Sequence, residues 1–258
     1  MKIRKLLLGL FLLKDELEYF HKSLSNETNP FNKFRLIKQN LIVLNTFLES
    51  LNKFDLYVKK NQELIVKTRS IRKRGELIKH MRNKIGGHLD EDVLIRSAQW
   101  TPHIFHKIAK ENRDLQIGLS YKSIIEASIN SYIDLSDNEK QKPFGTEIDL
   151  SYPPDETLFY NYLGNLNSDS IEWIETVLEI IEKDFEYFDD KETLHQSRIA
   201  GLTDFNLKKE FSLPKKEQLK NNEIVKLAEE AFNEVDVARK TELLNELIEK
   251  IEIKIKSC

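Results

Sequence analysis

The chain has few of the residues that make turns. Gly and Pro number 8 and 6 among 258 residues. Together they form about 5% of the sequence, against roughly 12% in average proteins. All-β sandwiches and barrels need a turn about every 8–12 residues, so this scarcity disfavours them and favours long helices. No G-x-G-x-x-G or G-x-x-x-x-G-K motif is present, which disfavours a doubly wound nucleotide-binding fold.

Cysteine is also nearly absent. The single cysteine, Cys258, excludes a disulfide within the chain and a zinc site built from several cysteines. His103 and His106 have the one-turn spacing of metal ligands, but no third ligand is obvious, so we interpret both as surface residues. We therefore expect a cytoplasmic protein that holds no metal and needs no cofactor.

Long apolar runs are missing as well. The apolar run 6–13 follows three cations and imitates a secretory signal, but Lys14, Asp15 and Glu16 come directly after it. It is too short to span a bilayer. The spacing of three and four residues continues beyond it, through Leu17 to Leu24. We therefore expect a buried amphipathic first helix rather than a signal or anchor, and no association with a membrane.

Further segments carry one-sided apolar stripes with the spacing of an amphipathic helix. Asn29 and Pro30 predict a helix start, and apolar residues then recur every three or four positions over 34–51. A similar series covers 171–188. One-sided helices must bury their stripes against one another. The sequence therefore predicts an all-α fold, a helix bundle.

The distribution of turn residues suggests how the chain is organised. We expect the bundle to occupy 1–190, with an irregular excursion over 136–167 that contains a short strand at 147–152. Prolines and glycines are concentrated there, and the strand segment alternates polar and apolar residues. A polar linker over 191–214 and a C-terminal helical hairpin over 215–258 complete the predicted organisation.

The small net charge of −3 hides a strong segregation. Residues 59–84 carry a net charge of +8, whereas residues 136–193 carry −12. A basic helix can bind a polyanion by releasing counterions. It can equally form a solvated face that pairs with the acidic helix of the same bundle, and the sequence leaves both interpretations open.

The helix expected over 61–85 ends in the segment Arg82-Asn83-Lys84-Ile85-Gly86-Gly87-His88. Arg82 falls on the apolar face of this helix, so we expect its guanidinium to point toward the bundle. We expect Gly86 and Gly87 to end the helix in a left-handed conformation. The resulting turn can bring His88 back toward Arg82.

An arginine beside a histidine suits phosphodiester chemistry on RNA. Histidine exchanges a proton near neutral pH, and arginine donates two parallel hydrogen bonds to phosphate oxygens. Asn83 can hold the imidazole or a phosphate in place. A second pair at the same spacing, Arg74 and His80, lies in mid-helix without a helix-ending glycine pair. The context therefore favours Arg82 and His88.

The segment from His80 to Asp90 resembles the R-x(4–6)-H motif of HEPN domains, in which a polar residue often follows the arginine as Asn83 does here. One subset of that family has a tyrosine two residues after the histidine, where this chain has Asp90. HEPN domains are helical bundles, and many are metal-independent RNases of prokaryotic defence or toxin–antitoxin systems. The resemblance thus implies an HEPN-like bundle with endoribonuclease activity.

The resemblance also implies roles for individual residues. Arg82, Asn83 and His88 would be the catalytic residues. Because two such motifs meet across a dimer in HEPN RNases, a homodimer is implied. Basic residues of the same helix, Arg74, Lys79 and Lys84, would attract the RNA backbone.

A second interpretation stays open beside this one. The chain would be a catalytically inactive HEPN-like helical module that binds a protein or nucleic-acid partner. A protein partner would bind through the acidic helix or the C-terminal hairpin. In that case Arg82 would brace the turn.

Overall fold

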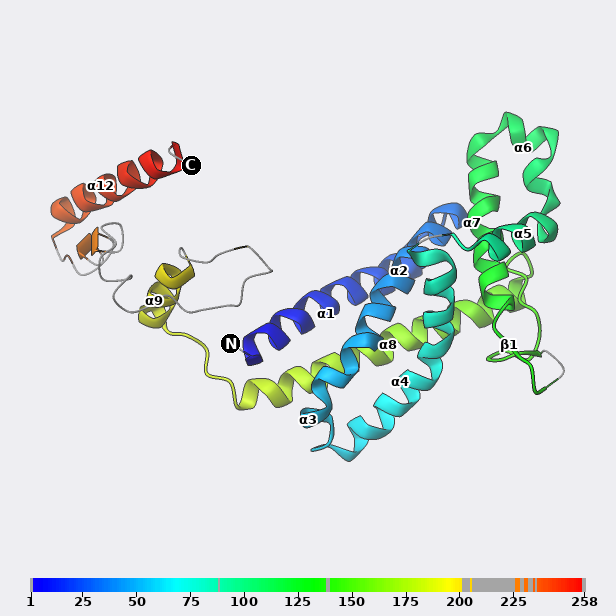
Figure 1. Cartoon of the computed structure of the whole chain (residues 1–258), viewed down its shortest axis with the longest axis horizontal. Helices are drawn as coiled ribbons and strands as arrows, with labels where there is room; N and C mark the ends of the chain where they lie inside the picture. Colours follow the sequence, from blue (N-terminus) through cyan, green and yellow to red (C-terminus); the bar gives the residue numbers. More distant parts are fainter. Residues whose placement is uncertain are drawn as a thin grey trace. The chain divides into compact units, whose positions relative to one another are not determined.

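The structure, a computed structural model, describes residues 2–87, 89–137, 140–200, 205, 226–227, 230–231, 234 and 236–256. Its secondary structure is mostly helical, which confirms the predicted all-α class (Figure 1). The chain forms two compact units, Met1–Phe185 and Glu186–Cys258. Within the described part of the chain, no helix combines the length and the hydropathy needed to cross a bilayer.

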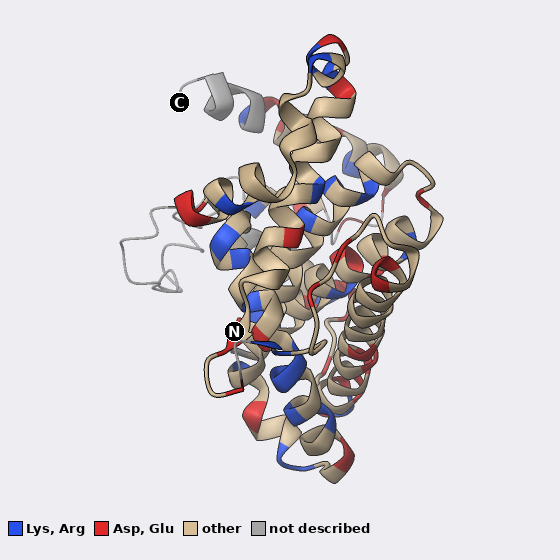
Figure 2. Cartoon of the chain, turned by 90° about the vertical axis from the view of Figure 1, so that its right-hand side faces the viewer, with Lys and Arg blue, Asp and Glu red and all other residues tan. Residues whose placement is uncertain are grey.

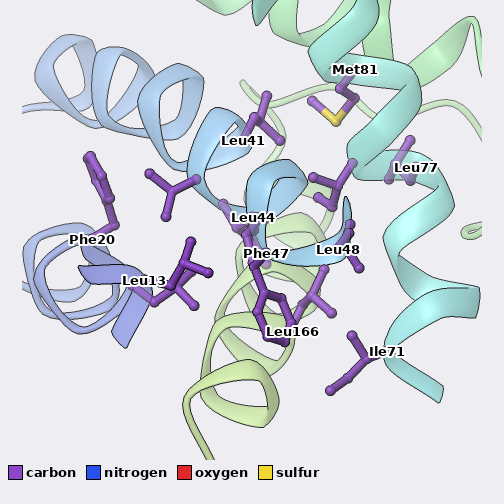
Figure 3. Close-up of a cluster of buried hydrophobic side chains, with 14 of the residues drawn as sticks. Leu13, Phe20, Leu41, Leu44, Phe47, Leu48, Ile71, Leu77, Met81 and Leu166 are labelled. Atoms are coloured by element: carbon purple, nitrogen blue, oxygen red, sulfur yellow. The ribbon is translucent and has the colours of Figure 1, made fainter. Parts of the chain in front are cut away.

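Four long helices form the core of the first unit. They are α1 (Lys2–Asn26), α2 (Pro30–Ser50), α4 (Gln62–Met81) and α8 (Pro153–Lys183). The start of α2 is as predicted, because the Asn29 side chain accepts the backbone N–H of Phe31 at 2.9 Å. Figure 3 shows leucines, isoleucine, phenylalanines and methionine from all four helices packed together.

The predicted burial of the first helix is confirmed. Leu10 and Leu17 of α1 are fully buried, and Leu6, Leu13 and Phe20 are nearly so. The stripe of α2 is buried along its whole length. These positions lie three or four residues apart, so each helix turns one continuous face to the core.

Shorter elements connect the long helices and cap one end of the bundle. The turn η1 (Leu51–Phe54) and the helix α3 (Asp55–Val58) join α2 to α4. After α4 come the π-helical turn η2 (Arg82–Gly86), α5 (Glu91–Trp100), the 3-10 turn η3 (Pro102–Phe105), α6 (Lys107–Glu111) and α7 (Arg113–Asn130). Helices α5, α6 and α7 gather at one end of the first unit (Figure 1), where α7 contacts α2, α4 and α5.

The irregular excursion is shorter than the predicted 136–167. Helix α8 already begins at Pro153 and runs for 31 residues. Pro153 and Pro154 occupy the first helical positions, where a proline loses no helical hydrogen bond. Gly164 lies inside the helix with no atom near the place of a Cβ. The prolines therefore start a helix where we had expected them to break one.

The predicted strand over 147–152 is also wrong. The small sheet instead pairs β1 (Ile133–Asp134) with β2 (Lys140–Gln141) in antiparallel fashion, with Ile133 opposite Gln141. The apolar alternation has another cause, because Ile148 and Leu150 are buried against the bundle without a strand partner. The Asn130 side chain holds Ile148 by exchanging two hydrogen bonds with its backbone, at 2.8 and 3.0 Å.

The second unit contains α9 (Asp190–Ala200) and α12 (Val237–Lys256). Helix α9 occupies the start of the predicted linker, most of whose remainder lies outside the described residues. Of the predicted hairpin, α12 is one arm. Leu243 of α12 is buried against Leu227 and Ala231, and most of the other arm is not described.

Candidate functional site

The Arg82 turn, residues 82–87, follows α4 directly and connects it to α5. It has π-helical hydrogen bonding, in which each N–H reaches back five residues, over Arg82–Gly86. The backbone N–H of Asp90 closes the connection by donating to the carbonyl of Lys84 at 3.0 Å. Asp90 then caps α5, because its carboxylate accepts the N–H of Val93 at 3.3 Å. Such wide turns are frequent at functional sites.

The glycine pair acts differently from what we had expected. Gly87 has φ of −92° and ψ of −31°, which is right-handed, so the predicted left-handed conformation is wrong there. The turn needs space at Gly86 instead. A Cβ added to Gly86 would lie 2.9 Å from Arg82 Cγ, whereas one added to Gly87 would meet nothing within 4 Å. Gly86 therefore makes room for the stem of the Arg82 side chain.

Arg82 lies half-buried on the apolar face of its helix, between the buried Ile78 and Ile85. Its guanidinium donates to the side-chain carbonyl of Asn83 at 3.3 Å. No carboxylate in the described part of the chain forms an ion pair with it. A cation that is held by a neutral amide keeps its full charge for an anionic ligand.

Lys84 and Asp90 form an ion pair beside Arg82, with Lys84 Nζ 2.8 Å from Asp90 Oδ2. The hydrogen bond from Lys84 lowers the pKa of the Asp90 carboxyl. Asp90 is therefore ionised near neutral pH, and the pair fixes the exit of the turn. The carboxylate of Asp90 in turn partly compensates the charge of Lys84.

His88 lies outside the described residues. The structure therefore brings Arg82 and Asn83 together, and the approach of His88 to Arg82 stays a prediction.

Other basic residues of α4 serve the fold. Arg74 forms an ion pair with Asp169 of α8, and its backbone carbonyl accepts the hydroxyl of Tyr162. Lys67 pairs with Glu172, one turn further along α8. Figure 2 shows that acidic and basic residues both occur along the helices of the chain. These contacts support the interpretation that the basic helix pairs with the acidic helix of its own bundle.

The predicted RNA-binding residues differ in the contacts that their side chains make. Lys79 pairs with Glu76 on the surface of α4, with 2.8 Å between Nζ and Oε1. Arg74 forms its ion pair with Asp169 of α8, so we no longer propose that it binds RNA. Lys84 stands within the Arg82 turn.

His80 is the other histidine close to this turn. Its Nε2 lies 2.9 Å from Ser131 Oγ, and its ring contacts that of Tyr132 at a centroid distance of 5.0 Å. Burial lowers its pKa, and the charges of Lys84 and Lys142 lower it further, against the opposite effect of Asp90. The second pair found in the sequence is thus separated, because Arg74 is bound to α8 and His80 to the end of α7.

Sequence reasoning missed a buried carboxylate near the same end of the bundle. Glu126 of α7 is fully buried, and its oxygens accept the indole N–H of Trp100 at 3.0 Å and the backbone N–H of Leu150 at 2.6 Å. Lys122 lies 2.7 Å from Glu126 Oε1. Burial nevertheless raises the pKa of Glu126. A lone carboxylate within the apolar run 124–129 was the signal that pointed to it.

The two tryptophans of the chain differ in exposure. The Trp100 side chain is anchored on Glu126, yet the residue is 43% exposed. Trp173, the other tryptophan, is fully buried and donates its indole N–H to Thr68 Oγ1 at 2.7 Å.

A search for metal-binding groups of three or more His, Cys, Asp or Glu found none in the described part of the chain. His103 and His106 are exposed, and His106 Nδ1 accepts the backbone N–H of Ile108 at 3.2 Å. His106 therefore caps the short helix α6.

Comparisons with protein-family models, curated proteins and solved structures gave no match for this chain. The fold and the site themselves define the chain as an all-α helix bundle that carries a cationic π-helical turn.

Proposed function

We propose that the chain is a metal-independent endoribonuclease of the HEPN type. The observation that carries the proposal is Arg82, a half-buried cation bound to the neutral Asn83 at a helix end. Arginines that are shielded from water for structural reasons are normally paired with a carboxylate, whereas the partly buried Arg82 is bound to an amide. A guanidinium without that pairing is available to a phosphate. A role in defence or in a toxin–antitoxin system belongs to the same proposal.

In the proposed reaction, neutral His88 of one protomer removes the proton from a ribose 2′-hydroxyl. The 2′ oxygen attacks the adjacent phosphorus, and the bond from phosphorus to the 5′ oxygen breaks. Protonated His88 of the second protomer gives its proton to the leaving 5′ oxygen. Arg82 stabilises the charge that develops on the non-bridging oxygens, while Asn83 orients the guanidinium.

One histidine cannot be base and acid in the same step, so the mechanism needs a homodimer. Exposed apolar residues directly after the Arg82 turn support a dimer face there: Leu89, Leu94 and Ile95 are 48%, 41% and 50% exposed. Apolar side chains grouped beside a site favour association. Lys79 precedes the turn and Lys84 lies within it, and both would guide the RNA backbone toward Arg82.

The test compares cleavage of a labelled single-stranded RNA by wild type and variants. We expect Arg82→Ala and His88→Ala each to slow cleavage on the order of a hundredfold or more. His80→Ala is the matched control and should retain activity, because His80 is held by Ser131 rather than by the turn. Circular dichroism checks that each variant is folded. Equal cleavage by wild type and both site variants would refute the proposal.

A second candidate is the catalytically inactive helical module. The ion pairs of Arg74 and Lys67 with α8 favour it, because they neutralise part of the basic helix within the bundle. This candidate predicts a stable complex with a protein partner and no effect of Arg82→Ala on any RNA substrate.

A further inference from the structure

A pocket of about 370 Å³ lies between α5 and α7. Its walls include Arg96, Gln99, Trp100, Asn130, Ser131 and Glu147. This volume is within the usual range for sites that bind small molecules or single ring systems.

Trp100 supplies a fixed aromatic wall. Its indole N–H is held by the buried Glu126 at 3.0 Å, so the ring cannot turn freely, while the residue remains 43% exposed. An anchored, accessible indole loses little freedom when a flat ligand stacks on it. The pocket therefore favours a planar aromatic ligand.

The polar groups of the pocket fall into two sets. Asn130 exchanges two hydrogen bonds with the backbone of Ile148, next to Glu147. Arg96, Gln99 and Glu147 are exposed and have no hydrogen-bond or ion-pair partner in the described part of the chain. They thus offer a guanidinium, an amide and a carboxylate to a ligand at the rim of an aromatic wall.

We propose that this pocket binds an unpaired guanine of an RNA strand. A carboxylate such as Glu147 accepts hydrogen bonds and matches the adjacent N1–H and N2–H donors of guanine. A guanidinium such as Arg96 donates to the O6 and N7 acceptors on the other edge. Adenine lacks the first pair of donors and the O6 acceptor. Trp100 stacks on the face of the base.

The wall of the pocket contacts the helix that precedes the Arg82 turn. Ser131 lies in its wall and contacts His80 Nε2 at 2.9 Å. His80 belongs to the last turn of α4, which leads directly into η2. This contact joins one wall of the pocket to the end of α4, the helix that the Arg82 turn follows. The identity of the ligand as RNA rests on the proposed function.

The test measures binding without cleavage, using the Arg82→Ala protein and tryptophan fluorescence. The probes are the hexaribonucleotides UUGUUU, UUAUUU and UUUUUU, and a stable hairpin RNA in whose stem the sequence UUGUUU is fully paired. We expect UUGUUU to quench the fluorescence and to bind about tenfold more tightly than the others, since one bidentate contact discriminates by about that much. Equal affinity for all four probes would overturn the proposal.

Variants assign the signal to the pocket. Trp173→Phe should keep the quenching, because Trp173 is fully buried. Trp100→Phe should lose the quenching but retain binding in fluorescence anisotropy with labelled RNA, whereas Trp100→Ala should lose both. Glu147→Gln should lose the preference for guanine, and Glu111→Gln on the exposed α6 is its control. Quenching that persists in Trp100→Phe would contradict the proposal.

The two proposals fail separately. Guanine-specific binding by a protein that never cleaves RNA refutes the nuclease and leaves the pocket intact. Cleavage that depends on Arg82 without any base preference in binding refutes the pocket alone.

Discussion

At the scale of single residues, the position of Arg82 depends on the absence of a side chain at Gly86. A methyl group at Gly86 would approach Arg82 Cγ to 2.9 Å, so the arginine stem must rotate away. Gly86→Ala should therefore slow RNA cleavage on the order of tenfold to a hundredfold, as displaced catalytic groups generally do. Initial rates on a labelled RNA measure the effect.

Gly87→Ala is the matched control for this substitution. Gly87 has a right-handed conformation and open space at its Cβ position, so the alanine should be tolerated. Both variants should melt close to the wild-type temperature. If Gly86→Ala and Gly87→Ala both cleave RNA at the wild-type rate, the position of the Arg82 side chain in this structure is not the one used in cleavage.

His80 links stability to pH at the same end of the bundle. Its folded-state pKa is below the ordinary value of 6.5, so the unfolded chain takes up this proton first as the pH falls. The stabilisation that neutral His80 contributes is fully present above pH 6.5, and it is lost as the pH falls toward the folded-state pKa. Urea denaturation at about pH 7.5 and about pH 5.5 should show a smaller difference for His80→Gln than for wild type. An unchanged difference would exclude His80 as a source of the pH dependence.

At the scale of elements, the path of α4 is set by its contacts with α2 and α8. Gly75 lets α4 approach α2 closely, because a Cβ there would lie 2.5 Å from Leu48 Cδ2. Gly75→Ala gains helix propensity but forces the buried Leu48 to move. Gly164→Ala in α8 gains the same propensity without a clash.

The difference between these two variants isolates the packing of α4 on α2. We expect Gly75→Ala to be about 1–3 kcal/mol less stable than Gly164→Ala, which is the usual cost of overpacking a core. Urea denaturation gives both free energies of unfolding. Equal values would show that α2 and α4 are not packed closely at Gly75.

The elements that the sequence predicted correctly are those with a long, one-sided apolar stripe. In α1 and α2, burial follows the spacing of three and four residues, so periodicity alone was sufficient. The start of α8 was missed because Pro153 and Pro154 are equally compatible with a helix start and with a break. Whether the two prolines start or break a helix depends on the contacts of α8 with α1 and α4, two helices that are distant from it in sequence.

The candidate site was predictable only in part for a similar reason. The sequence identified Arg82, Asn83 and the end of the helix, since these are local features. It did not reveal that Arg74 pairs with Asp169, 95 residues away. Nor did it reveal that Trp100 is anchored by Glu126 and exposed, because a tryptophan in an apolar stretch is more often buried.

At the scale of the whole molecule, the proposed cleavage mechanism requires two copies of the chain. The exposed apolar residues after the Arg82 turn are the proposed contact, so Leu94→Glu should weaken the dimer and reduce cleavage in parallel. Leu12→Glu is the control, since Leu12 is 59% exposed on α1. Light scattering of purified protein at micromolar concentration measures the mass. A monomeric wild type that cleaves RNA would contradict the need for a dimer.

In the proposed function, RNA is cleaved through attack of its own 2′-hydroxyl at the Arg82 turn. The most direct measurement incubates the protein, in excess EDTA, with an RNA oligonucleotide and with the same strand carrying one 2′-deoxynucleotide at the mapped cleavage position. We expect the RNA to be cut to a product ending in a 2′,3′-cyclic phosphate, and the substituted strand to remain intact there. Cleavage of the substituted strand at that position, or cleavage that requires added magnesium, would contradict the account.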